Sequence, residues 1–364
     1  KHWLNSPAAF QSMTAGMTGT AIKRLVLRQI RATEMPVAPL REQKRIADKL
    51  DAVLARVDAC RERLANVVPL LKRFRQSVLA AATSGSLTEE WRRITQTESD
   101  GQDVIRKDAQ AKAELLKTEP SLGKKKSSAN GKVNEDYLFT VPDTWAFTSW
   151  GQMSEWITYG FTRPMPATSA GHRLVTAKDV HPFDLRLDAS GHTSETAFAN
   201  LSEKDRPTAG DLLITKDGTI GRAALVRTSE PFCINQSVAV VWLRSTSMNR
   251  GFLEVVANVD YTQRFVIEKA KGMAIQHLSI TDFAQCPVPV PPLDEQAEIV
   301  RRVELLFAFA ERLEDRLAQA QAATDRLTPA LLAKAFRGEL VPQDPADEPA
   351  LELLKRIRST SPAE

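Results

Sequence analysis

The side chains that could do chemistry in this sequence are cations, amides and a few other polar residues that fall at predicted turns. Arginine and lysine can grip guanine or phosphate, and glutamine and asparagine can pair with adenine edges. These residue types indicate DNA contact, although an exposed side chain that contacts nothing is an equally simple interpretation of any one of them. The candidates are Tyr159, Thr162, Arg163, Lys216, Arg222, Asn235, Gln236, Lys271, Gln276 and His277.

Motifs for catalysis or cofactor binding are absent from the sequence. It contains neither a Gly-x-x-x-x-Gly-Lys-Ser/Thr phosphate loop nor a Gly-x-Gly-x-x-Gly loop. An amino-methyltransferase would carry Asn/Asp-Pro-Pro-Tyr/Phe, and the nearest string is Val290-Pro291-Pro292-Leu293, which lacks the polar residue and the aromatic. The five histidines show no metal-ligand spacing and no nucleophile partner. We therefore expect no catalytic residue, no cofactor and no metal ion.

Charge is unevenly distributed along the chain. The net charge is +4, with +9 in residues 1–136, −1 in residues 137–288 and −4 in residues 289–364. A nucleic-acid site must therefore be a local patch.

No apolar run approaches the ~18–20 residues of a membrane span. The three cysteines match neither a zinc site nor a disulfide framework, which fits a reducing, cytoplasmic setting, and Cys60 is expected to be buried.

Residues 36–85 contain a pattern that occurs twice. Pro39-Leu40-Arg41-Glu42-Gln43 returns 253 positions later as Pro292-Leu293-Asp294-Glu295-Gln296, and Gly85-Ser86-Leu87 returns as Gly338-Glu339-Leu340. The match, which extends upstream to Gly19–Ile22 and Gly272–Ile275, predicts an internal duplication rather than two unrelated amphipathic helices. Each copy carries an apolar seam in steps of three and four, which is typical of a coiled coil. The seams are Ile46, Leu50, Val53, Val57, Cys60, Leu64, Val67, Leu71, Phe74 and Val78, and Ile299, Val303, Leu306, Ala310, Leu313, Leu317, Ala320, Thr324, Leu327 and Leu331.

Two long helices must carry these seams. The first is predicted over 41–84, with Pro69 expected to kink or restart it. The second is predicted over 294–336, with Asp294 as its N-cap and Pro329 interrupting it near its end. An exposed helix over 100–118 and a Lys-rich segment, 124–132, lie after the first helix. That segment is expected to be a mobile linker, whose lysines could also touch phosphates.

Residues 137–288 read as a mixed α/β domain between the helices. Segments 211–215 and 223–226 flank a predicted hairpin turn, 237–243 is a buried strand because both of its faces are apolar, and 252–271 is a helix. The fold class is therefore α+β. The expected parts are 1–35, the end of an earlier domain; 36–87, the first helix; 88–136, a linker; 137–288, the central domain; 289–341, the second helix; and 342–364, a tail.

The repeated entry and exit motifs around a variable domain resemble the specificity subunit of Type I restriction–modification enzymes. The resemblance implies that two target-recognition domains are joined by two helices packed antiparallel as a coiled coil. Each domain of such a subunit reads one half of a bipartite site in double-stranded DNA. The subunit itself is not catalytic, and docks methyltransferase and restriction subunits. Residues 137–288 would be the second recognition domain and residues 1–35 the remnant of the first.

Two other interpretations remain open from the residues. The chain could be the DNA-recognition part of a self-contained restriction-methyltransferase whose catalytic half is absent here. It could also be a coiled-coil scaffold with no role on DNA. A cofactor loop and a methyltransferase tetrapeptide upstream of this sequence would favour the restriction-methyltransferase. A lack of DNA protection with partner subunits present would favour the scaffold.

Overall fold

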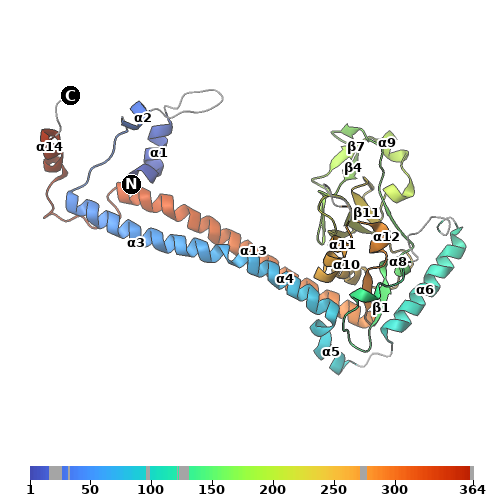
Figure 1. Ribbon diagram of the computed structural model, residues 1–364. Coiled ribbons are helices and arrows are strands. Elements are labelled where there is room, and N and C mark those ends of the chain that lie inside the picture. The colour runs from blue at the N-terminus through green and yellow to red at the C-terminus, as the bar shows by residue number, and fades with distance from the viewer. Residues whose placement is uncertain are drawn as a thin grey trace. The chain divides into compact units, whose positions relative to one another are not determined.

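The computed structural model describes residues 1–15, 27–31, 33–95, 99–120, 122, 131–270 and 277–360 (Figure 1). The chain forms two compact units. The first unit contains Lys1–Lys72 and Ala310–Glu364, and the second contains Arg73–Phe309. Among the described residues, no helix is long and apolar enough to cross a membrane.

The first unit is helical. Its main contact is between α3 (Leu40–Ala65) and the later part of α13 (Leu293–Phe336). Leu50 clusters with Leu332 and Ala335, while Arg61, further along α3, pairs with the earlier Asp325 over 3.2 Å. Because a later residue of α3 contacts an earlier residue of α13, the two helices are antiparallel, as predicted. The remaining elements of this unit are the short η1 (Trp3–Asn5), α1 (Pro7–Thr14), α2 (Leu27–Arg31) and α14 (Ala350–Thr360).

The long helices differ from the prediction at their prolines. The predicted helix 41–84 is two helices, because α3 ends at Ala65 and α4 (Val67–Ser84) restarts with Pro69 in its first turn, where a missing N–H costs nothing. Pro329, by contrast, does not interrupt α13, since the buried Leu332 and Ala335 stabilise the turn that follows. Asp294 is not the N-cap but lies within the first turn of α13.

Two seam residues are not buried as expected. Cys60 is exposed, and Leu327 keeps 47% of its surface exposed. Thr324 of the predicted seam is buried, but the next buried residue of α13 is Leu332 rather than Leu331, which is the direction in which a straight helix of 3.6 residues per turn drifts from a heptad. The seam therefore drifts around the helix where the sequence predicted a strict repeat.

The second unit begins with the later part of α4, followed by η2 (Ser86–Thr88), α5 (Glu89–Ile94) and α6 (Gly101–Thr118). Helix α6 is not exposed as predicted, because Val104 and Asp108 are buried. Asp108 accepts hydrogen bonds from Ser247 N at 2.8 Å and Ser247 Oγ at 2.6 Å, which attaches the helix to the central domain. Of the Lys-rich segment, residues 124–130 lie outside the described residues.

Within the described residues, the strands of the second unit form four small sheets. The main one has the antiparallel order β2 (Trp156–Tyr159), β11 (Val238–Trp242), β8 (Leu212–Thr215) and β9 (Ala223–Leu225). It contains the predicted hairpin and the predicted buried strand, whose five residues are all buried. The second has the order β10 (Phe232–Ile234), β4 (His172–Val175), β7 (Gly191–Thr193) and β3 (Ala167–Thr168). Two pairs complete the set, β1 (Ala146–Ser149) with β12 (Pro287–Val290) and β5 (Val180–His181) with β6 (Asp184–Leu185).

Helices cover the main sheet and close its core. The predicted helix 252–271 is two helices, α10 (Arg250–Asn258) and α11 (Asp260–Glu268). The break follows from Asn258, whose amide donates to Ala223 O at 3.0 Å and accepts from Ala223 N at 3.2 Å, while Val259 is extended and buried. The short elements are η3 (Glu135–Tyr137), α8 (Trp150–Met153), α9 (Glu195–Ala199), η4 (Glu203–Asp205) and α12 (Ile280–Phe283).

Within this unit the central domain and the helix ends share one hydrophobic core. Val78 and Leu79 of α4 and Ile299 of α13 are buried in the same cluster as Phe252 and Phe265 of the domain. The chain segments 73–87 and 299–309 also run antiparallel, since Arg75 stacks over Phe307 at 5.1 Å, whereas the later Leu87 accepts a hydrogen bond from the earlier Arg302. The ends of α4 and α13 therefore pack into the hydrophobic core of the central domain.

Candidate nucleic-acid interface

Most of the predicted contact residues gather at one end of the main sheet. Tyr159 ends β2, Lys216 follows β8, and Asn235 and Gln236 precede β11. Because β11 runs antiparallel to both β2 and β8, its start lies beside their ends. Arg222 lies directly before β9, the return strand of the hairpin, and its N–H donates to Thr215 Oγ1 at 2.9 Å. The sequence predicted these residues separately, and the sheet brings them together.

A short loop, residues 235–237, ties the neighbouring turns to this end. Gln236 N donates to Phe161 O at 2.8 Å, and Lys216 N donates to Ser237 O at 2.8 Å. Ser237 Oγ in turn accepts from Ala177 N at 2.9 Å. Three segments that are far apart in sequence are thereby held at fixed positions around one loop, which is a requirement for reading bases in register.

Two lysines lie beside Tyr159. The Nζ atoms of Lys216 and Lys204 lie 5.1 Å and 5.7 Å from the centre of the Tyr159 ring, and Lys204 also donates to Tyr159 O at 2.8 Å. Asp217 lies 2.9 Å from Lys216 Nζ and 2.7 Å from His277 Nδ1. One carboxylate, that of Asp217, therefore positions two potential phosphate-binding groups, and Lys204 is likewise paired with Asp205 at 2.8 Å.

The amides and the arginine of the loops have different roles. Asn235 Oδ1 accepts from Ser237 N at 3.1 Å and from Ser237 Oγ at 2.6 Å, so this side chain builds the turn. Gln236 and Thr162 are exposed, and Arg163, also exposed, donates to Asn200 O at 2.9 Å. All four residues line a cavity of about 290 Å³. Of this group, Gln236 has the most freedom to meet a base edge.

Two of the predicted contact residues lie outside the described residues, and the sequence analysis did not predict two lysines that lie near this end of the sheet. Lys271 and Gln276 fall within 271–276, outside the described residues. Sequence reasoning did not single out Lys178 or Lys204. Lys178 is exposed in the turn whose Ala177 is bonded to the 235–237 loop, and Lys204 reaches Tyr159. Neither lysine is near a predicted strand end, so only the tertiary contacts reveal them.

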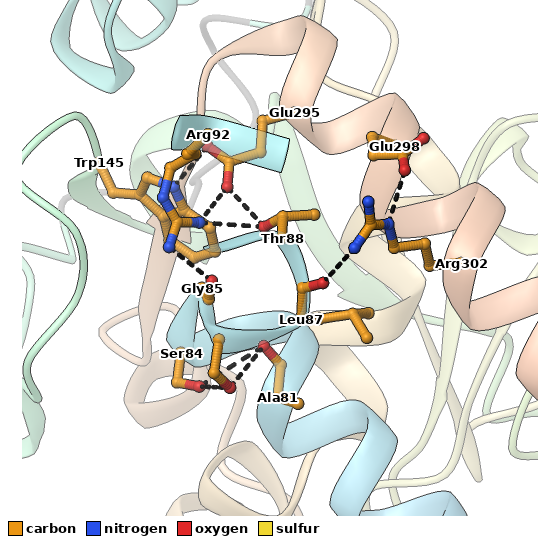
Figure 2. A network of polar contacts seen from close by, with 11 residues as sticks. Ala81, Ser84, Gly85, Leu87, Thr88, Arg92, Trp145, Glu295, Glu298 and Arg302 are labelled. Carbon is orange, nitrogen blue, oxygen red and sulfur yellow. Dashed lines mark hydrogen bonds and ion pairs between the residues drawn. The ribbon is translucent and has the colours of Figure 1, made fainter. Parts of the chain in front are cut away.

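A second polar network connects parts of the two repeated motifs (Figure 2). Glu295 is fully buried and accepts from Thr88 Oγ1 at 2.6 Å, from Trp145 Nε1 at 2.9 Å and from Arg92. Arg92 also donates to Gly85 O at 2.6 Å. The entry motif of the second copy is thus connected through Arg92 to Gly85 in the exit motif of the first.

The flank of this network is held by a glutamate and two arginines of α13. Arg302 donates to Leu87 O at 2.7 Å and is itself paired with Glu298 at 2.6 Å. Hydrogen bonding and charge from Arg301 and Arg302 lower the pKa of Glu298 to about 2. These groups stabilise a helix end.

Comparison with known proteins identifies the family. A family model described as "Type I restriction modification DNA specificity domain" matches residues 173–321. The EcoBI specificity subunit of Escherichia coli is 31% identical over 348 residues, covering 95% of this chain and 66% of the relative. The EcoKI specificity subunit of Escherichia coli strain K12 is 28% identical over 362 residues, covering 96% and 67%. The chain therefore spans about two thirds of the length of these relatives.

Solved structures agree on the fold. A chain from a type I R-M system, studied for its complex assembly and conformational transition, matches with a TM-score of 0.63 and 20% identity over 93% of this chain and 70% of that one. The HsdS subunit of Thermoanaerobacter tengcongensis matches with a TM-score of 0.51 and 20% identity, over 93% and 69%.

Fold and site together define a class of proteins in which an α/β domain is mounted on an antiparallel helix pair. Within that class, the chain belongs to the specificity subunits of Type I restriction enzymes. This confirms the expected family and fold class, and it separates the chain from the catalytic subunits of such enzymes.

Proposed function

We propose that the chain recognises DNA sequence as a specificity subunit, with residues 137–288 as a target-recognition domain that reads one half of a bipartite site. The observation that carries the proposal is the sheet end where Tyr159, Lys204, Lys216 and Gln236 gather around one loop. Cations there suit phosphates and an exposed amide suits an adenine edge. The family membership supports the same function.

The helix pair has a different role in this proposal. The segments 36–87 and 289–341 hold the reader and dock methyltransferase and restriction subunits, and 88–136 connects helix and reader. Because the two helices are near copies of each other, they cannot encode two different half-sites. The chain would act in the cytoplasm on double-stranded DNA, and the methyl donor and ATP would be bound by its partners.

The decisive experiment exchanges residues 137–288 for the corresponding domain of another family member. Methylome sequencing of cells that also express the partner subunits should show one half-site changed and the other intact. If both half-sites stayed the same, residues 137–288 would not be the reader. A parallel insertion of whole turns into the helix pair should change the spacing between the half-sites and leave their sequences intact.

A measurement of cofactor binding distinguishes the proposed specificity subunit from the alternative, a restriction-methyltransferase. Calorimetry on the purified chain with S-adenosylmethionine should give no binding heat, because the sequence lacks a cofactor loop and the methyltransferase tetrapeptide. Micromolar binding would favour that alternative.

A further inference from the structure

The turn between β5 and β6 holds a phenylalanine in a backbone conformation that glycine normally adopts. Pro182 and Phe183 are the two residues of this turn, and Phe183 has a φ of 64°. Among the described residues, it is the only one other than glycine with a positive φ. In a turn that begins with proline, a second residue with positive φ is usually Gly or Asn, because a larger side chain is strained there. Such strain persists only where surrounding contacts hold the residue in place.

Two contacts hold Phe183 in this conformation. Its N–H donates to Ala223 O in β9 at 3.0 Å, and its ring packs edge-on against Phe307 of α13, with the ring centres 5.3 Å apart. Phe307 is held in turn by Arg75 of α4, whose guanidinium carbon lies 5.1 Å from the ring centre. A glycine would form the turn without strain, but it has no side chain to reach α13. The contact with the helix pair therefore accounts for the phenylalanine.

The other end of the hairpin is attached to the loop around which the predicted DNA contacts gather, the reading loop, residues 235–237. Asp179 directly precedes β5, and its carboxylate accepts from Thr176 N at 2.8 Å and from Thr176 Oγ1 at 3.0 Å. These bonds shape the turn from which Ala177 N donates to Ser237 Oγ at 2.9 Å. One short hairpin therefore reaches from the reading loop to α13.

The hairpin is also packed into two hydrophobic clusters. Val180 is fully buried in a cluster with Leu213 and Val238 of the main sheet. Phe183 packs against the other cluster, which contains Ile299 of α13. Because protein interiors are close-packed, the hairpin cannot swing without opening one of these clusters. An element enclosed at both ends fixes the orientation of the reading loop relative to the helices.

We propose that the β5–β6 hairpin sets the angle between the reading loop and the helix pair, and that Phe183 is a positioning residue that makes the complex selective for one spacing between half-sites. The inference rests on the proposed function of residues 137–288. Phe183 does not touch DNA in this arrangement. It acts through Phe307 on one side and through the turn at Ala177 on the other.

The geometry of DNA gives the physical reason. One extra base pair between the half-sites moves one half by about 3.4 Å and rotates it by roughly 35° around the duplex. The reading loop can follow that rotation only if the hairpin leaves α13, which breaks the contact between Phe183 and Phe307. An edge-on ring pair changes an equilibrium by about two- to tenfold. Without the contact, the penalty for the wrong spacing is smaller by that factor.

The test compares the affinity of the assembled complex for three DNA duplexes. They carry the half-sites, found by methylome sequencing with the wild-type chain, at the natural spacing or with one base pair more or fewer. Phe183→Leu removes the ring contact, and Phe307→Leu removes it from the other side. Each variant should prefer the natural spacing about two- to tenfold less than the wild type does. The double variant should show no larger effect, because both changes remove one shared contact.

Phe139→Leu is the matched control. Phe139 is also half-buried, and its ring packs edge-on against Phe147 with centres 5.2 Å apart, but neither residue belongs to the hairpin or to α13. This variant should keep the wild-type spacing preference. An unchanged preference in Phe183→Leu and Phe307→Leu, or an equal change in Phe139→Leu, would overturn the inference. A wild-type complex without any sequence preference would instead contradict the proposed function on which the inference rests.

Discussion

Trp145 donates its indole N–H to Oε2 of Glu295 over 2.9 Å, in a site where the glutamate is completely buried. The tryptophan opens the central domain and the glutamate lies in the first turn of α13. This bond joins a domain with irregular turns to a helix whose motif is repeated elsewhere in the chain. Domain and helix end are consequently one cooperative structure within their unit.

Removing Glu295 should therefore destabilise the second unit strongly. Glu295→Ala leaves Arg92 without its buried partner and Trp145 without an acceptor, and we expect a loss of about 3–5 kcal/mol. Urea unfolding followed by tryptophan fluorescence measures it. Glu304→Ala, at an exposed position of the same helix, should change stability by less than about 0.5 kcal/mol. A loss in Glu295→Ala no larger than in this control would show that the network contributes nothing.

Lys178 and Lys216 are expected to meet phosphates. Lys178→Ala and Lys216→Ala should each weaken binding to cognate and unrelated DNA alike. Each should also reduce the slope of log affinity against log salt by about 1, because one fewer counterion is released. Anisotropy titrations of the assembled complex at several salt concentrations measure both effects. Lys107→Ala, an exposed lysine on α6, is the control, and an unchanged slope in both variants would remove these lysines from the interface.

Asn235 and Gln236 form a matched pair that separates loop building from base reading. Gln236→Ala should cost about 1–3 kcal/mol on cognate DNA and relax specificity at one position, with no change in melting temperature. Asn235→Ala should lower the melting temperature, because its side chain holds Ser237. Selection from a randomised DNA library and thermal scans measure these outcomes. A broadened motif in neither variant would contradict the assignment of Gln236.

The contribution of helix packing to the stability of the first unit can be tested with the same Leu→Ala substitution at two positions. Leu50→Ala should destabilise that unit by about 2–5 kcal/mol, because Leu50 is fully buried against Leu332. Leu70→Ala removes the same atoms from a side chain that is 52% exposed, so its cost should be much smaller. Thermal melting followed by circular dichroism compares them. Equal losses would mean that the packing of Leu50 is not what stabilises the pair.

The stability of the second unit should depend on pH through Glu298. Its pKa is lowered to about 2 from 4.5 by Arg301 and Arg302, so the folded state holds this proton less tightly than the unfolded state. The stabilisation is therefore complete above pH 4.5 and is lost as the pH falls towards 2. The melting-temperature difference between wild type and Glu298→Gln should shrink from pH 6 to pH 3. Glu304→Gln controls for the loss of one charge, and a difference that stayed constant with pH would contradict the argument.

The sequence by itself determined the duplication, because matching motifs recur 253 positions apart. It also determined most of the two seams, the central hairpin and the buried strand, because each rests on local periodicity or turn chemistry. It also predicted the residue types at the sheet end. It did not determine that Asn258 breaks a helix, that Leu327 leaves the seam, or that Lys204 reaches Tyr159. Those features depend on contacts between segments distant in sequence: Asn258 pairs with Ala223, a straight helix drifts from the heptad, and Lys204 reaches the end of β2 from a separate loop.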